Sequence, residues 1–207
     1  MAIAISKTAA IAAAVITRVR RKHNPPAANN CAIPIARVHA VVLTARGNPK
    51  GIKVWDDLLN RGVRVAVPNP GAAVGKLTRE HLTRTRRWAA LKPHVVDAGT
   101  VTEAANATKA GSAESAVDAA IVWDAVASAP AYRGQTVLTL PELEGVEGRI
   151  EVTVLKQSRE PAAALRFARY VAATDRGLVH FRQYKFRVAE NAERWESRPA
   201  TEQGGSK

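Results

Sequence analysis

Residues 63–76, VRVAVPNPGAAVGK, decide the fold. Residues 63–67 are rich in β-branched side chains and predict a buried strand, and residues 72–84 predict a helix. A strand that passes through a tight loop of small residues into a helix is typical of a parallel α/β sheet. The first amides of such a helix attract negative charge, so the loop at 68–76 and the helix start that follows it are a candidate anion-binding site. An ordinary turn, with glycines for geometry alone, is the alternative.

The rest of the chain continues this alternation of strands and helices. Strands are expected at 38–45, 94–97, 119–123 and 149–155, and helices at 54–60, 101–110, 160–173 and 175–184. The order predicts an α/β fold with a mixed, mostly parallel sheet flanked by helices.

Two further strand ends carry candidate ligand-binding residues. The segment GTVTE, 99–103, begins a helix, with Thr100 or Thr102 as its cap and Val101 in its first turn. The strand AAIVW, 119–123, delivers Trp123 and Asp124 to the same sheet edge. An indole N–H can donate to a ligand and a carboxylate can accept from one. Core packing and helix capping would require the same residues, so both interpretations stay open.

The charge of +13 is concentrated at the start of the chain, because residues 1–55 hold nine basic side chains and no acidic one. The sequence has no recognition helix and no aromatic residues interleaved with basic ones, so nucleic-acid binding is not expected. A second basic group, expected to be a solvated helix face, consists of Arg79, Arg84, Arg86 and Arg87.

No pattern for catalysis, a cofactor or a metal is present. The spacing of Gly71 and Gly75 is one residue too short for a P-loop, and no serine lies in a nucleophile-elbow motif. Cys31 is the only cysteine, which excludes an intramolecular disulfide and a zinc site built from several thiolates. Asp97 and Asp124 could meet at the sheet edge, but catalysis through them is not expected. The chain is therefore predicted not to be an enzyme.

Residues 9–17 are apolar but too short to span a bilayer, so no membrane insertion is expected. Only Lys7 precedes this stretch and four cations follow it, which is the wrong polarity for a secretory signal. Residues 1–37 are therefore expected to be a basic leader, either disordered or a poor signal.

A series of short motifs follows in one order through the chain: 47–52 (GNPKGI), 55–59 (WDDLL), 63–66 (VRVA), 69–70 (NP), 75–76 (GK), 100–104 (TVTEA), 120–124 (AIVWD), 141–146 (PELEGV), 154–158 (VLKQS), 164–168 (ALRFA) and 181–186 (FRQYKF). Each motif is modest, but their ordered series over residues 34–186 resembles the molybdate-type substrate-binding proteins of ABC importers, which have the type 2 periplasmic fold.

The resemblance implies two α/β lobes around a hinge that close on a tetrahedral oxyanion, with molybdate or tungstate expected first. The amides of Ala73, Val74, Gly75 and the helix start at Val101 would bind it, and Trp123 would replace an anion-contacting tyrosine. A membrane permease would be the partner. The location would be periplasmic or extracellular, or cytoplasmic if the leader is not a signal.

The front of the chain departs from this family, because most of the first half-lobe is missing. We therefore expect a complete ligand-binding lobe with hinge strands at 38–157, helices of an incomplete lobe at 158–188, and a disordered tail at 189–207. The helices at 160–173 and 175–184 are expected to have little partner surface. The alternative function is a truncated lobe without a transport role, acting as an intracellular sensor or partner-binding module.

Overall fold

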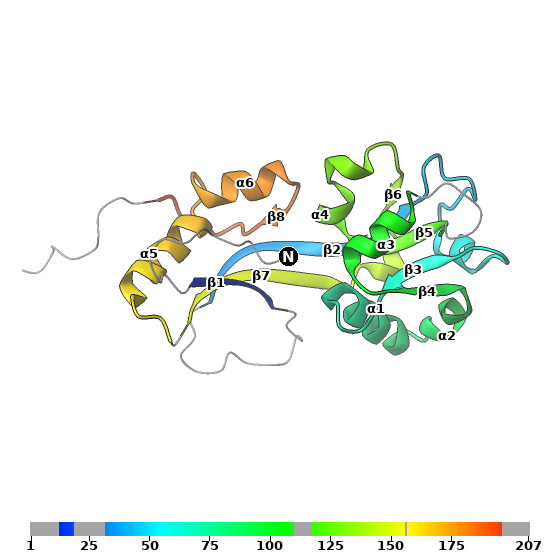
Figure 1. Cartoon of the computed structure of the whole chain (residues 1–207), viewed down its shortest axis with the longest axis horizontal. Coiled ribbons are helices and arrows are strands. Elements are labelled where there is room, and N and C mark those ends of the chain that lie inside the picture. The colour runs from blue at the N-terminus through cyan, green and yellow to red at the C-terminus, as the bar shows by residue number, and fades with distance from the viewer. Residues whose placement is uncertain (1–12, 19–31, 110–116, 156, 196–207) are drawn as a thin grey trace, which may run out of the picture.

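The computed structural model describes residues 13–18, 32–109, 117–155 and 157–195 (Figure 1). In these residues the strands form one sheet with the order β1-β7-β2-β5-β3-β4, and β6 and β8 also pair with β2. The strands are β1 (Ala13–Arg18), β2 (Ala32–Thr44), β3 (Val65–Pro68), β4 (Val95–Ala98), β5 (Ala119–Trp123), β6 (Val137–Leu138), β7 (Glu147–Val154) and β8 (Arg187–Val188).

Helices flank this sheet as the sequence predicts. The α-helices are α1 (Ala73–Arg84), α2 (Trp88–Leu91), α3 (Val101–Ala107), α4 (Asp124–Ala127), α5 (Pro161–Ala172) and α6 (Gly177–Gln183). Short 3-10 helices in the described residues cover Trp55–Leu59, Lys92–His94, Pro130–Tyr132 and Pro141–Leu143. The mixed α/β fold is therefore confirmed. The expectation that the sheet is mostly parallel is wrong, because in the described residues only β3 with β4 and β3 with β5 pair in parallel and the other strand pairs are antiparallel.

Two long strands, β2 and β7, connect the two ends of the molecule (Figure 1). The first part of β2 pairs with β7 and β8, and its last five residues pair with β5. The expected hinge strand at 38–45 thus begins earlier, at Ala32. The lobe with β3, β4, β5 and helices α1 to α4 lies at one end, and α5, α6 and β8 lie at the other.

The core of the larger lobe has two layers because β3 is buried on both faces. Val65 and Val67 belong to the layer that contains Val74 and Leu82 of α1. Ala66 belongs to the opposite layer, which contains two alanines of α3, Ala104 and Ala105. The small side chains in this second layer allow α3 to lie close to the sheet.

Helix α5 packs against the long strands through Ala164, Ala168 and Ala172, which are buried and spaced by four residues. Such spacing places them on one face of the helix. The expectation that this helix has little partner surface is therefore wrong, because β7 and β2 supply that surface.

The leader, expected to be disordered or a poor signal, and the tail, expected to be disordered, both contain ordered residues. Strand β1 and the start of β2 lie within the expected leader, and β1 pairs with β7. At the other end, residues 189–195 contact the body of the protein. The Ala189 N–H donates to the Ile35 carbonyl at 2.8 Å, and the Trp195 N–H donates to Asp175 Oδ1 at 2.8 Å. The other residues of both segments, including Cys31, lie outside the described part of the chain.

A larger side chain on the buried face of α5 tests this packing. We expect Ala168→Leu to lower the free energy of unfolding by about 1–3 kcal/mol, because residue 168 is 1% exposed and extra methyl groups would overpack the interface. Denaturant unfolding measures the change. The matched control is Ala163→Leu on the exposed face of the same helix. Equal effects of both variants would contradict the packing of α5 on the strands.

Candidate functional site

The carboxyl ends of β4, β3 and β5 form one edge of the sheet. Pro68 of β3 pairs with Ala98 of β4, and Ala66 pairs with Ala120 of β5 in the same direction. The Asn69 N–H also donates to the Ala98 carbonyl at 2.7 Å. The candidate residues predicted from the sequence therefore lie along this edge, where α1, α3 and α4 begin (Figure 1).

The start of α1 offers backbone amides ahead of the helical hydrogen bonds. The Gly71 and Ala72 N–H groups donate to Asn69, to its side chain at 2.9 Å and its carbonyl at 3.0 Å. The first amide with a carbonyl acceptor in the helical ladder is that of Lys76, which donates to Ala72 at 3.0 Å. The N–H groups of residues 73–75 precede this bond and can donate to an anion.

Gly75 allows α1 to start directly against the end of β3. A Cβ added at Gly75 would lie 2.0 Å from the Pro68 carbonyl oxygen and 2.4 Å from that of Asn69. No L side chain fits at that distance, so the close backbone contact by itself requires a glycine at position 75. Val74 is fully buried, and its side chain belongs to the core beneath the helix start.

The start of α3 is closed by a capping box between Thr100 and Glu103. The Glu103 N–H donates to Thr100 Oγ1 at 3.1 Å, and the Thr100 N–H donates to Glu103 Oε2 at 3.2 Å. Thr100 is therefore the cap, rather than Thr102. The Glu103 carboxylate accepts from the Thr100 amide of this helix start. The amides of Val101 and Thr102 precede the first helical hydrogen bond, which runs from the Ala104 N–H to the Thr100 carbonyl.

Trp123 is 9% exposed and belongs to the larger core cluster. A Cβ added at Gly148 of β7 would lie 3.2 Å from two carbons of the Trp123 ring. Gly148 thus provides the space into which the indole packs. The packing role that the sequence left open is present, and contact with a ligand stays a prediction.

The Asp124 carboxylate joins the edge of the sheet to the long strand β2. Its Oδ1 accepts from the His39 and Ala125 N–H groups at 3.1 and 2.8 Å. Its Oδ2 lies 3.7 Å from His39 Nδ1 and 3.8 Å from Arg187 Nε. These contacts give Asp124 protein partners from three segments. Asp97 pairs instead with Arg79, so each of these carboxylates has a cationic partner of its own.

Glu147 of β7 extends this network along the strands. Its carboxylate lies 3.5 Å from His39 Nε2, 3.1 Å from Arg37 Nη1 and 3.4 Å from Arg149 Nε. Burial opposes ionisation of Glu147, but these cationic neighbours outweigh it and lower its pKa. The sequence gives no sign of this network, because Arg37 and His39 of β2 are far from Glu147 and Arg149 of β7 in the chain.

The solvated-face interpretation of the second basic group is wrong for Arg79. Its side chain is 17% exposed and donates to the carbonyls of Pro68 and Gly75 as well as to Asp97. Arg84, Arg86 and Arg87 are exposed, as expected. Arg79 is thus a structural residue beneath the start of α1.

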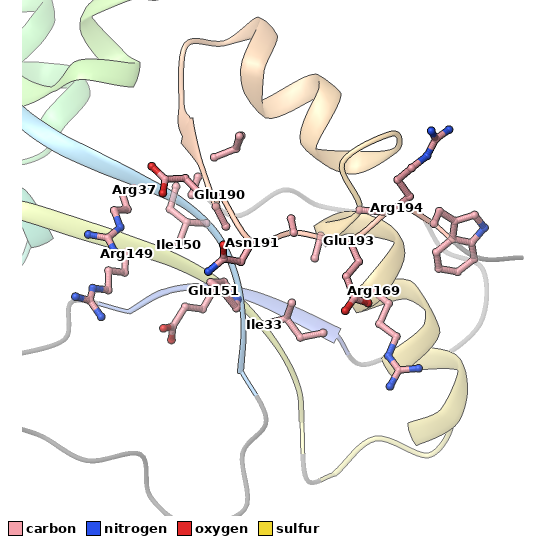
Figure 2. A pocket seen from close by; sticks show the side chains of 18 of the residues that line it. Ile33, Arg37, Arg149, Ile150, Glu151, Arg169, Glu190, Asn191, Glu193 and Arg194 are labelled. Atoms are coloured by element: carbon pink, nitrogen blue, oxygen red, sulfur yellow. The ribbon is translucent and has the colours of Figure 1, made fainter. Parts of the chain in front are cut away.

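A large groove of about 1620 Å³ lies away from the predicted site (Figure 2). Its walls are β2, β7, α5 and residues 187–195, and none of the predicted ligand-binding residues lines it. Arg37 and Arg149 lie at one end, and Arg169 and Arg194 lie toward the other (Figure 2). The groove has mixed charge, because its lining also contains Glu147, Glu151, Glu190 and Glu193.

The part of the chain that the structure describes contains no group of three His, Cys, Asp or Glu side chains that could hold a metal ion. None of its helices is long and apolar enough to cross a membrane.

Comparisons with solved structures agree with this fold. The substrate-binding domain of a putative molybdenum ABC transporter from Clostridium difficile aligns with a TM-score of 0.58 and 20% identity, over 75% of this chain and 65% of that chain. The sulfate-binding protein SubI from Mycobacterium tuberculosis H37Rv aligns with a TM-score of 0.57 and 24% identity, over 77% and 59%.

Among curated proteins, the molybdate-binding protein ModA of Mycobacterium bovis is 33% identical over 133 residues, which are 64% of this chain and 48% of ModA. The chain thus spans about half the length of this relative. The resemblance to molybdate-type binding proteins that the ordered motifs indicate is confirmed.

The sequence model of the family described as bacterial extracellular solute-binding proteins matches residues 8–187. The match includes the long strands, the lobe with the candidate site, and helices α5 and α6. The chain therefore belongs to the bacterial extracellular solute-binding protein family.

Proposed function

We propose that this chain is the receptor component of an ABC importer and binds a small tetrahedral oxyanion without covalent chemistry. Molybdate or tungstate is the expected ligand, and the membrane permease is the partner that receives it. Family membership and the names of the molybdate-binding and sulfate-binding relatives support this proposal. Periplasmic or extracellular location belongs to the same proposal.

The observation that carries the proposal is the start of α1. Three consecutive amides, those of Ala73, Val74 and Gly75, precede the helical ladder at the edge where α3 also begins. A fully deprotonated oxyanion can accept from such donors, and hydrogen bonds to charged groups contribute about 1.5–3 kcal/mol each. The partial positive charge of the helix start adds to this attraction.

A second candidate function is a lobe without a transport role that acts as an intracellular sensor or partner-binding module. Two observations favour it. Trp123 packs into the core, and the Asp124 carboxylate is taken up by His39, Ala125 and Arg187. Residues that a receptor would present to its ligand therefore also have structural partners, so a folded lobe that does not bind an anion would keep them.

Titration with molybdate, tungstate, sulfate and phosphate tests the proposed function, with Gly75→Ala as the site variant. We expect the wild type to bind at least one of them. Gly75→Ala should weaken binding by about tenfold or more, or about 1.4 kcal/mol, because its Cβ would displace the helix start from the Pro68 carbonyl. Isothermal titration calorimetry measures both affinities.

Thr83→Ala, at an exposed position on the same helix, is the matched control and should bind as the wild type does. The absence of heat and of any thermal shift with all four oxyanions would reject the receptor function. Wild-type affinity in Gly75→Ala would place the anion elsewhere.

Trp123→Phe separates ligand contact from packing at the sheet edge. Phenylalanine keeps an aromatic ring in the space beside Gly148 but removes the indole N–H. If the indole donates to the anion, affinity should fall about tenfold, a change of about 1.4 kcal/mol. Calorimetry on the folded variant measures this change, and its thermal unfolding transition reports the packing. A loss of stability with unchanged affinity would assign Trp123 to the core alone.

A further inference from the structure

Arg79 lies one helical turn after Gly75, on the same face of α1. Its guanidinium donates to the Pro68 carbonyl, to the Gly75 carbonyl at 3.2 Å and to the Asp97 carboxylate. It also lies over the ring of Trp88, 5.1 Å from the centroid. Three acceptors and one aromatic ring therefore surround a single cationic group.

The three acceptors belong to the segments that build the sheet edge. Pro68 ends β3, and Gly75 lies in the first turn of α1. Asp97 lies in β4, three residues before the Thr100 cap of α3. One planar guanidinium thus connects the end of β3, the start of α1 and the strand that leads into α3. A guanidinium presents several N–H donors in a fixed geometry, which an ammonium group cannot do.

We propose that Arg79 is a positioning residue of the anion site, which sets the separation and orientation of the amide groups at the starts of α1 and α3. This inference rests on the proposed function, since it assigns a role to Arg79 in the same site. Arg79 acts through the backbone and does not touch the anion. Donors that are already fixed in place cost less to order on binding.

The pairing with Asp97 is the weaker part of this arrangement. The Asp97 side chain is 72% exposed, while that of Arg79 is 17% exposed. An ion pair that is open to water on one side contributes little. The two carbonyl acceptors are backbone atoms of the site itself, so their bonds to Arg79 fix the geometry of the amides directly. Loss of Arg79 should therefore matter more than loss of Asp97.

The charge of Arg79 also favours an anion at this edge. A mostly covered guanidinium is screened less by water than an exposed one, so its field reaches further. The exposed Asp97 carboxylate is screened more strongly and compensates this field incompletely. Arg79 therefore adds positive potential beneath amides that are themselves neutral donors.

The experiment compares Arg79→Met, Arg79→Lys, Asp97→Asn and Arg84→Met in the full chain. Amide NMR spectra report the residues at both helix starts, and calorimetry with molybdate, tungstate and sulfate reports affinity well below the unfolding temperature. We expect Arg79→Met to shift the Gly75 and Thr102 amide resonances, to speed their hydrogen exchange and to weaken binding about tenfold.

Arg79→Lys should recover part of the affinity because it keeps the charge. Asp97→Asn should remain within about twofold of wild type, because its amide oxygen can still accept from Arg79 and only the exposed ion pair is lost. Arg84→Met, at an exposed position of the same helix, should match the wild type. If Arg79→Met does not fold, Arg79→Lys carries the test, with the same amide shifts and a smaller loss of affinity expected.

The inference is overturned if a folded Arg79 variant keeps wild-type amide resonances at residues 73–75 and 100–102. It is also overturned if the variant loses only unfolding free energy while its affinity stays unchanged. If the wild type binds none of the oxyanions, the proposed function fails by itself. The NMR comparison then still decides whether Arg79 positions the two helix starts.

Discussion

The close contact between the first turn of α1 and the end of β3 fixes the rest of this lobe. Gly75 brings the helix backbone against the Pro68 and Asn69 carbonyls, and Arg79 bonds the carbonyls of Pro68 and Gly75. From this contact α1 buries Val74 and Leu82 against Val65 and Val67. The same contact holds the amides of residues 73–75 at the sheet edge, so packing and candidate site depend on one geometry.

Local patterns predicted most of the large lobe. A β-branched strand and an amphipathic helix are defined by neighbouring residues, so β3, α1 and β5 fall close to their predicted bounds. Pairings between distant segments carry no such signal. Strand β1 pairs with β7, and the Trp195 N–H donates to Asp175. The local sequence around β1 favours a leader and that around Trp195 favours a tail. Composition alone therefore predicted too little structure at both ends.

In the candidate site, too, contacts between distant segments could not be predicted from the sequence. Residue order placed Thr100, Trp123 and Asp124 correctly at one edge, because the carboxyl ends of parallel strands lie together. It could not show that Trp123 packs beside Gly148 or that His39 donates to Asp124, since these partners come from other segments. The capping box can be predicted from local sequence, because Thr100 and Glu103 are three residues apart.

Four arginines near the long strands and the sheet edge have carboxylate partners within the described residues. Arg79 pairs with Asp97, Arg37 and Arg149 pair with Glu147, and Arg187 lies near Asp124. An arginine already engaged in this way would have to give up its partner to bind an anion directly. Backbone amides at a helix start lose no such interaction, because their intrahelical acceptors are missing by geometry. In this fold, neutral donors at the start of α1 can therefore contact an oxyanion while Arg79, which bonds the Pro68 and Gly75 carbonyls, orders the backbone behind them.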